Sequence, residues 1–251
     1  MDLGLTDRVY VVSGGSRGLG FAVARALTAE GARVVVSGRD AEALAGAVTA
    51  LGGQRTTGVA ADNADAAAPE RLVDAALQRW GRLDGALING GGPSTGSMLH
   101  LTDADWRQSF ESVFLGAVRL ARVVSEHLAA DGALAFVLST SARTPIPGLD
   151  TSNGLRPGLA MVTKSLANQL GGRGIRVNAL LPGRITTERT RYIDAHTPTG
   201  TSSGSATAAI PLGRAGEPEE FGRVAAFVLS PAASYVNGAV IPVDGGATPS
   251  Y

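Results

Sequence analysis

Residues 9–20 read Val-Tyr-Val-Val-Ser-Gly-Gly-Ser-Arg-Gly-Leu-Gly, and this stretch decides which fold the rest of the chain can have. The first four residues are β-branched or aromatic, which is typical of a buried strand. A glycine-rich turn follows, and a helix-like apolar pattern then runs from Phe21 to Leu27 until Gly31 ends it. The stretch therefore predicts a strand, a tight turn and a helix in direct succession.

A strand, a turn and a helix in this order form the setting in which a dinucleotide-binding loop works. Glycines let the backbone turn sharply and approach a pyrophosphate closely, while the N–H groups at the helix start face the phosphates. The glycines here are spaced Gly14-x-x-x-Gly18-x-Gly20, not Gly-x-Gly-x-x-Gly. An ordinary turn between a strand and a helix is therefore the alternative interpretation of this stretch taken alone.

Composition sets the broad class of the protein. The 251 residues are 44% hydrophobic and 18% charged, which suits one α/β domain with a large core, or at most two small domains. The formal net charge is zero, so neither a nucleic acid nor an acidic membrane is expected as a partner. The chain contains no cysteine, which excludes disulfides, thiolate metal sites and thiol catalysis.

Metal binding and membrane insertion are also not expected. The three histidines lie far apart and lack the spacing of metal ligands, so we predict no metal site. The N-terminal residues do not resemble a signal peptide, and no apolar run is long enough to span a bilayer. A cytoplasmic protein is the resulting expectation.

Short apolar runs alternate with helix-like segments along the whole chain. Further strands are expected at 33–36, 59–61, 86–88, 134–138, 175–179 and 239–243, with helices at 41–51, 69–80, 102–130, 153–170 and 218–229. Because the runs are apolar throughout, the strands should be parallel and covered by helices on both faces. The sequence predicts a single α/β domain over residues 1–251, a doubly wound, Rossmann-like sheet of about seven strands.

A second glycine-rich turn, residues 89–93, follows the fourth expected strand. In a doubly wound sheet the carboxyl ends of the first and fourth strands meet at the topological switch point, where ligands bind. Two such turns at one crevice favour cofactor binding more strongly than either does alone.

The order of motifs resembles that of the short-chain dehydrogenase/reductase family over essentially the whole chain. The matching motifs are Gly14-x-x-x-Gly18-x-Gly20, Asp62, Asn89-Gly90-Gly91-Gly92, Ile175-Arg176-Val177-Asn178, Pro182-Gly183-x-Ile185-x-Thr187, Gly213-Arg214-x-Gly216-Glu217-Pro218 and Val243-Asp244-Gly245-Gly246. The resemblance implies that residues 186–216 form a lid over a small-molecule substrate, and that the chain forms a dimer or tetramer through helices 102–130 and 153–170. It implies cofactor contacts from Gly14, Ser16, Arg17, Gly18, Leu19, Gly20, Arg39, Asp62, Asn63, Asn89, Gly90, Gly91, Arg156, Pro182, Gly183, Ile185 and Thr187.

The expected active site departs from the family. Its members carry a Ser after the fifth strand and then Tyr-x-x-x-Lys, in which Tyr is the general acid/base, Lys lowers its pKa and holds the ribose, and Ser steadies the substrate oxygen. Counting back from Asn178 at the family's spacing places Ser152 at the Tyr position and Arg156 at the Lys position. Ser139 or Thr140 falls at the Ser position. A similar Ser-Asn-x-x-Arg stretch is typical of a divergent bacterial branch that resembles oxoacyl reductases.

These substitutions change the available chemistry. Cations can bring a phenol with a pKa of about 10 toward 7, but a serine hydroxyl is far too weak an acid for that role. Arg156 can supply charge and paired hydrogen bonds to ribose hydroxyls, yet it cannot release a proton near neutral pH. We therefore predict binding roles for both residues. Alternatively, Ser152-Asn153 only N-caps the helix, with Pro157 in its first turn.

The second strand favours NADP(H) over NAD(H). NAD enzymes of this kind place an acidic residue at its end to hold the ribose 2′-hydroxyl. Here the strand ends with Arg39, and Asp40 is better placed as a helix cap. Arg39 and Arg17, which follows Ser16, suit a 2′-phosphate of about −1.5 to −2 charges. Solvated surface arginines are the alternative.

The sequence leads to three hypotheses about function. The first is an NADP(H)-dependent oxidoreductase acting on a carbonyl or hydroxyl group, an oxoacyl compound among the candidates, with a non-standard proton source. The second is an NADP(H)-binding sensor or scaffold without turnover. The third is a non-redox lyase or isomerase on the same fold.

Overall fold

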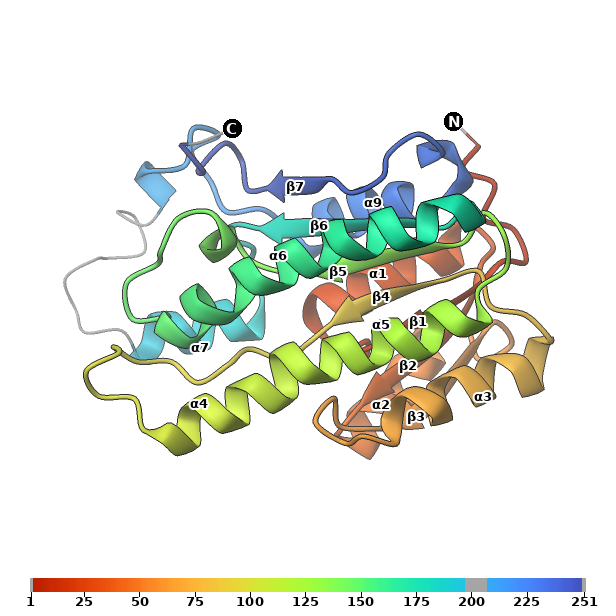
Figure 1. Ribbon diagram of the computed structural model, residues 1–251, viewed down its shortest axis with the longest axis horizontal. Coiled ribbons are helices and arrows are strands. Elements are labelled where there is room, and N and C mark those ends of the chain that lie inside the picture. The colour runs from red at the N-terminus through yellow and green to blue at the C-terminus, as the bar shows by residue number, and fades with distance from the viewer. Residues whose placement is uncertain (1, 197–206, 250–251) are drawn as a thin grey trace.

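The apolar runs of the sequence form a seven-stranded sheet in the order β3-β2-β1-β4-β5-β6-β7 (Figure 1). A computed structural model describes residues 2–196 and 207–249. All neighbouring strands in the sheet are parallel. The strands are β1 (Val9–Val12), β2 (Arg33–Gly38), β3 (Thr56–Ala60), β4 (Gly85–Asn89), β5 (Ala133–Val137), β6 (Arg176–Pro182) and β7 (Val240–Val243). This arrangement confirms the predicted doubly wound α/β fold.

Helices cover both faces of the sheet (Figure 1). The longer ones are α1 (Gly18–Ala29), α2 (Ala41–Ala50), α3 (Ala68–Trp80), α4 (Asp103–Ser109), α5 (Gly116–His127), α6 (Asp150–Leu170), α7 (Glu188–His196) and α9 (Pro218–Leu229). Helices α3, α5 and α6 share one core with the sheet, and α1, α2 and α9 share the other. The short elements are a π-helix, η1 (Phe110–Leu115), and three 3-10 turns, η2 (Thr140–Ala142), η3 (Gly171–Arg173) and η4 (Pro231–Ala233).

Local signals fix several helix ends where the sequence predicts them. The carboxylate of Asp40 accepts from the first backbone N–H groups of α2 and so caps that helix. Thr102 and Asp105 form a reciprocal capping box at the start of α4. Helix α3 ends at Gly81, whose φ of 71° lies in the left-handed region that glycine favours.

Two expectations about the long helices are wrong in detail. The helix expected over 102–130 is interrupted by η1, a π-helical segment of the kind often found near functional sites. Helix α6 begins at Asp150, so Pro157 lies inside it instead of in the first turn. The helix tolerates this because Pro157 is exposed, and its missing N–H leaves only the Asn153 carbonyl without a helix partner.

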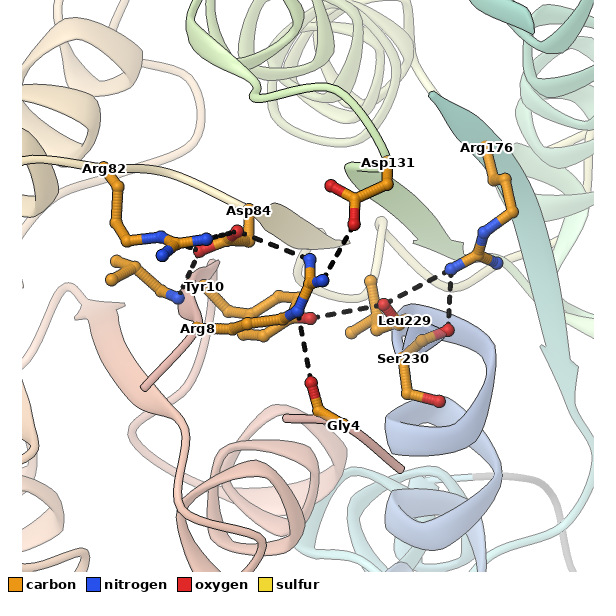
Figure 2. Close-up of polar contacts among 10 residues, drawn as sticks. Gly4, Arg8, Tyr10, Arg82, Asp84, Asp131, Arg176, Leu229 and Ser230 are labelled. Carbon is orange, nitrogen blue, oxygen red and sulfur yellow. Dashed lines mark hydrogen bonds and ion pairs between the residues drawn. The ribbon is translucent and has the colours of Figure 1, made fainter. Parts of the chain in front are cut away.

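A network of charged side chains around the buried Asp84 carboxylate holds the amino ends of the strands together (Figure 2). The fully buried carboxylate of Asp84 accepts from the Val9 N–H at 2.8 Å and from Nη2 of Arg82 at 2.6 Å. Arg8 lies 3.5 Å from the same carboxylate and donates to Asp131 at 2.8 Å. Every buried acceptor here has a donor, so these charges stabilise the fold at the edge opposite the predicted site.

Tyr10 and Arg176 lie at the same edge of the sheet and donate hydrogen bonds to backbone carbonyls at the end of α9 (Figure 2). The Tyr10 hydroxyl donates to the Leu229 carbonyl at 3.3 Å, and burial raises its pKa. Arg176 donates to the carbonyls of Val228 and Ser230 at 2.8 Å each. Tyr10 is therefore a core residue and cannot replace the family's catalytic phenol.

Within residues 2–196 and 207–249, no helix has both the length and the apolarity needed to cross a membrane.

Candidate cofactor and active site

Each glycine of the loop after β1 has its own structural requirement. Gly14 has a φ of 60°, and a Cβ there would lie 2.9 Å from Nδ2 of Asn89. A Cβ at Gly20 would overlap the Gly14 carbonyl oxygen. Gly18 has a φ of 56°, but a Cβ there would meet only the Thr187 methyl, at 4.0 Å. The loop thus needs glycine at Gly14 and Gly20 to pack, and at Gly18 to turn.

The N-terminus of α1 is open toward this loop. Arg17 occupies the N-cap position with extended backbone and makes no side-chain cap. The first N–H groups of the helix therefore have no side-chain acceptor and are suited to phosphate oxygens. This is the geometry that the sequence predicts for a pyrophosphate site.

Hydrogen bonds tie the loop to the neighbouring strands. Asn89 donates from Nδ2 to the Gly14 carbonyl at 3.2 Å, and its own N–H donates to Ser13 Oγ at 2.8 Å. Asn63 donates to the Asn89 carbonyl at 3.2 Å. On the other side, Ser37 Oγ accepts from the Gly14 N–H at 3.2 Å. Asn89 and Asn63 thus fix the glycine loop relative to the carboxyl ends of β4 and β3.

The two arginines expected to hold a 2′-phosphate lie at this edge and pair with carboxylates. Arg17 lies 3.3 Å from Glu188 and 4.0 Å from Asp40. Arg39 lies 3.8 Å from Asp62. Both guanidinium groups are more than half exposed, so these ion pairs are weak and an incoming phosphate can replace them.

The remaining predicted cofactor residues lie around the same edge. A Cβ at Gly38 would lie 2.7 Å from Ser16 Oγ, so this hydroxyl packs against the end of β2. Leu19 packs on the core beneath the loop. Gly90 faces the backbone of η1, and a Cβ at Gly91 would meet nothing within 4 Å.

The segment from Pro182 to Thr187 connects β6 to α7 and reaches the glycine loop. The Gly183 N–H donates to the Val243 carbonyl at 3.0 Å, and Gly183 lies against Asp244. Ile185 is buried in the core. The Thr187 hydroxyl accepts from the Thr190 N–H at 3.2 Å near the start of α7, and its methyl faces Gly18.

Ser152 faces a different hydroxyl from the two that the sequence singles out. Ser139 Oγ accepts from the Ser141 N–H at 3.1 Å and opens η2, of which Thr140 is the first residue. The η2 turn brings Ser141 Oγ to 2.9 Å from Ser152 Oγ, with both residues buried. Ser141 is therefore a candidate site residue that the sequence reasoning missed, because counting along the loop does not reveal a 3-10 turn.

The structure rules out Ser152 as the N-cap of α6. The N-cap position is Leu149, without a side-chain cap, and Ser152 is the third residue of the helix. Asn153 pairs with the backbone of Ile146 in the preceding loop, accepting at 2.9 Å and donating at 3.0 Å. The helix starts earlier than expected because this pairing holds the loop before it.

Arg156 carries a buried charge without a carboxylate partner among the described residues. Its side chain, 6% exposed, donates from Nη1 to the Val137 carbonyl at 2.6 Å. Its Nε is buried and has no hydrogen-bond acceptor in the described parts of the chain. Burial, with a contribution from the nearby charge of Arg189, lowers the pKa of Arg156 to about 10. The guanidinium stays charged at neutral pH.

Arg189 of α7 is a second cation that sequence reasoning missed. It donates from Nη2 to the Pro93 carbonyl at 2.8 Å and lies so close to Gly92 that a Cβ there would be 2.5 Å from its Nε. Burial lowers its pKa. Its guanidinium carbon lies 5.7 Å from the centre of the Tyr192 ring. No spacing signal marks Arg189, since only the fold brings α7 onto the loop after β4.

Val113 and Lys164 supply no further catalytic group. Val113 is buried in η1 and offers only an apolar side chain. Lys164 lies two turns beyond Arg156 on α6, where its Nζ would be 2.8 Å from a Cβ at Gly238. Lys164 therefore does not stand in for the family's lysine.

Comparison with known proteins identifies the family. A family model described as enoyl-(acyl carrier protein) reductase matches residues 14–248. An uncharacterized oxidoreductase of Methylorubrum extorquens is 35% identical over 246 residues, covering 96% of this chain and 98% of the relative. Meso-2,3-butanediol dehydrogenase of Serratia marcescens is 33% identical, covering 97% and 96%.

A similar solved structure supports the same family assignment. L-sorbose reductase from Gluconobacter frateurii, complexed with NADPH and L-sorbose, is 28% identical with a TM-score of 0.91 over the full length of both chains. The chain belongs to the short-chain dehydrogenase/reductase family of oxidoreductases.

Proposed function

We propose that the protein is an NADP(H)-dependent oxidoreductase that acts on a carbonyl or hydroxyl group with a non-standard active site. The observation that carries this proposal is the glycine loop itself. It combines the left-handed backbone of Gly18, the open N-terminus of α1 and the bond from Asn89 to Gly14. When bound, NADP(H) would supply the hydride transfer, and the protein would bind and orient both reactants.

The proposed preference for NADP(H) rests on Arg17 and Arg39. A 2′-phosphate carries more charge than the single carboxylates with which these arginines pair, and guanidinium binds phosphate through two parallel hydrogen bonds. One similar solved structure, L-sorbose reductase, is a complex with NADPH. Asp40 is already engaged in capping α2 and is poorly placed to select a free 2′-hydroxyl.

The proposed active site positions the substrate and stabilises charge. Ser152 and Ser141 offer two adjacent hydroxyls to a substrate oxygen, and Arg156 holds a positive charge on the same helix as Ser152. A fixed cation in a buried site favours a developing negative charge on that oxygen. Neither hydroxyl is acidic enough to deliver a proton at neutral pH. The proton therefore has to come from water or another group.

Turnover is tested by mixing the purified protein with NADPH and a panel of ketones, aldehydes and oxoacyl thioesters while following the absorbance of the reduced nicotinamide. Oxidation of NADPH that depends on one class of carbonyl supports the proposal. Tight NADPH binding without oxidation across the panel supports the second candidate, a sensor or scaffold. That candidate is favoured by one observation, the serine hydroxyl of Ser152 at the position that the sequence register assigns to the family's Tyr.

We further propose assembly into a dimer or tetramer through α5 and α6, and a substrate lid formed by residues 186–216. Of this segment, residues 197–206 lie outside the described parts of the chain. Light scattering at micromolar concentration tests the assembly, and a clean monomer would contradict it. A cytoplasmic location remains an expectation.

A further inference from the structure

We infer that Arg189, supported by Arg156, binds an anionic group on the substrate, so that the substrate is a carbonyl compound carrying a carboxylate. This inference rests on the proposed function and names the substrate class of that site.

The two guanidinium groups come from different helices onto the same set of loops. Arg189 reaches from α7 to the Pro93 carbonyl at 2.8 Å. The loop after β4 also holds the start of α6, because Thr151 Oγ1 donates to the Ser94 carbonyl at 2.5 Å. Arg156 lies one turn farther along α6 than Ser152 and reaches the end of β5. The loop after β4 thus contacts Arg189 directly, and it contacts α6, which carries Arg156 and Ser152, through Thr151.

Neither charge is neutralised by the described residues. Both arginines donate to backbone carbonyls, and no carboxylate of residues 2–192 or 207–249 forms an ion pair with either. Arg156 is nine-tenths buried with an unpaired Nε, and burial and the charge of Arg189 both lower its pKa. Arg189 is half-buried, and burial lowers its pKa as well. A buried charge without a counterion is costly, so this arrangement is suited to an anionic ligand.

The substrate is a better source of that anion than the cofactor. The pyrophosphate has the open N-terminus of α1, and a 2′-phosphate has Arg17 and Arg39, which lie around the ends of β1 and β2. Arg189 instead contacts the loop after β4, and Arg156 contacts the end of β5 beside Ser141 and Ser152. This is the side of the crevice on which the carbonyl should lie.

The test is calorimetric binding to protein saturated with NADP+, which allows no carbonyl reduction. The probes are 2-oxo and 4-oxo carboxylates of increasing chain length, each paired with its methyl ester. The variant is Arg189→Gln, and the matched control is Arg223→Gln, an exposed arginine on α9 outside the proposed lid. NADP+ affinity is measured separately for each protein.

We expect at least one carboxylate to bind about tenfold or more tightly than its ester, since hydrogen bonds to charged groups contribute about 1.5–3 kcal/mol. Arg189→Gln should remove that difference and leave NADP+ affinity unchanged, and Arg223→Gln should change neither. Equal binding of acids and esters, or no binding of either, would overturn the inference while NADP+ binding is intact. An Arg189→Gln variant that loses NADP+ affinity would show that Arg189 binds the cofactor's phosphates. Failure of the parent to bind NADP+ would refute the proposed function itself.

Discussion

Substitution of Gly18 by valine should separate cofactor binding from folding. Gly18 has a φ of 56°, and an L-residue in that region costs about 1–2 kcal/mol. The added side chain meets no protein atom closer than 4.0 Å at its Cβ, so there is no clash to add to this strain. For a chain of this length, the loss corresponds to a fall of roughly 2–8 °C in melting temperature. The protein should stay folded.

Cofactor affinity should fall much further. The valine would occupy the space in front of the first N–H groups of α1, where the pyrophosphate is expected. Losing two hydrogen bonds to a charged group at about 1.5–3 kcal/mol each raises Kd by roughly two to four orders of magnitude. Fluorescence titration with NADPH measures this change, and thermal unfolding measures stability in the same samples.

Gly81→Val is the matched control for Gly18→Val. Gly81 also has a left-handed φ, 71°, and a Cβ there would meet nothing within 4 Å, but it ends α3 at the opposite edge of the sheet. It should lose similar stability and keep NADPH affinity. Unchanged NADPH affinity in Gly18→Val, or an equal loss in both variants, would refute the assignment of the phosphate site.

Four other predictions concern the active site and pH. Ser152→Ala should lower turnover less than about tenfold, because a hydroxyl of this acidity is not the proton donor. Complete loss of a robust activity in this variant would contradict that role. Arg156→Ala should weaken NADPH binding, as measured by titration. The double variant Ser152→Tyr, Arg156→Lys should create or raise carbonyl reductase activity if circular dichroism shows that it folds, and a folded but inactive variant would count against the register. The Arg214 hydrogen bond and the Glu217 N–H lower the pKa of Glu220 to about 2. Its stabilising effect should be complete above about pH 4.5 and lost as pH falls toward 2, so the difference in Tm between the parent and Glu220→Gln should shrink over that range.

Features set by neighbouring residues could be predicted from the sequence. The cap at Asp40, the capping box at Thr102 and the bounds of α9, Pro218–Leu229, depend on side chains within one turn of the helix end. The sheet also followed, because fully apolar runs alternating with helices leave few parallel arrangements. The glycine loop could also be predicted from its own residues. Its position beside Asn89 then follows from the predicted order of strands, which makes β1 and β4 neighbours.

Features set by contacts between distant segments could not be predicted. Ser141 meets Ser152 only because η2 turns the chain after β5, and Arg189 reaches Pro93 only because α7 folds back over the loop after β4. The early start of α6 depends on Asn153 pairing with Ile146 in a loop without a recognisable motif. Sequence counting therefore placed the glycine loop after β1 correctly but did not reveal which side chains surround Ser152.

The most direct test of NADP(H) use is a pair of titrations that measure Kd for NADPH and NADH on the parent and on Arg39→Ala. Arg39 is exposed and paired only with Asp62 among the described residues, so the variant should fold normally. NADPH should bind the parent about tenfold or more tightly than NADH, and Arg39→Ala should lose affinity for NADPH alone. NADH binding as tightly as NADPH to the parent, or an equal loss of both cofactors in the variant, would contradict the proposed cofactor.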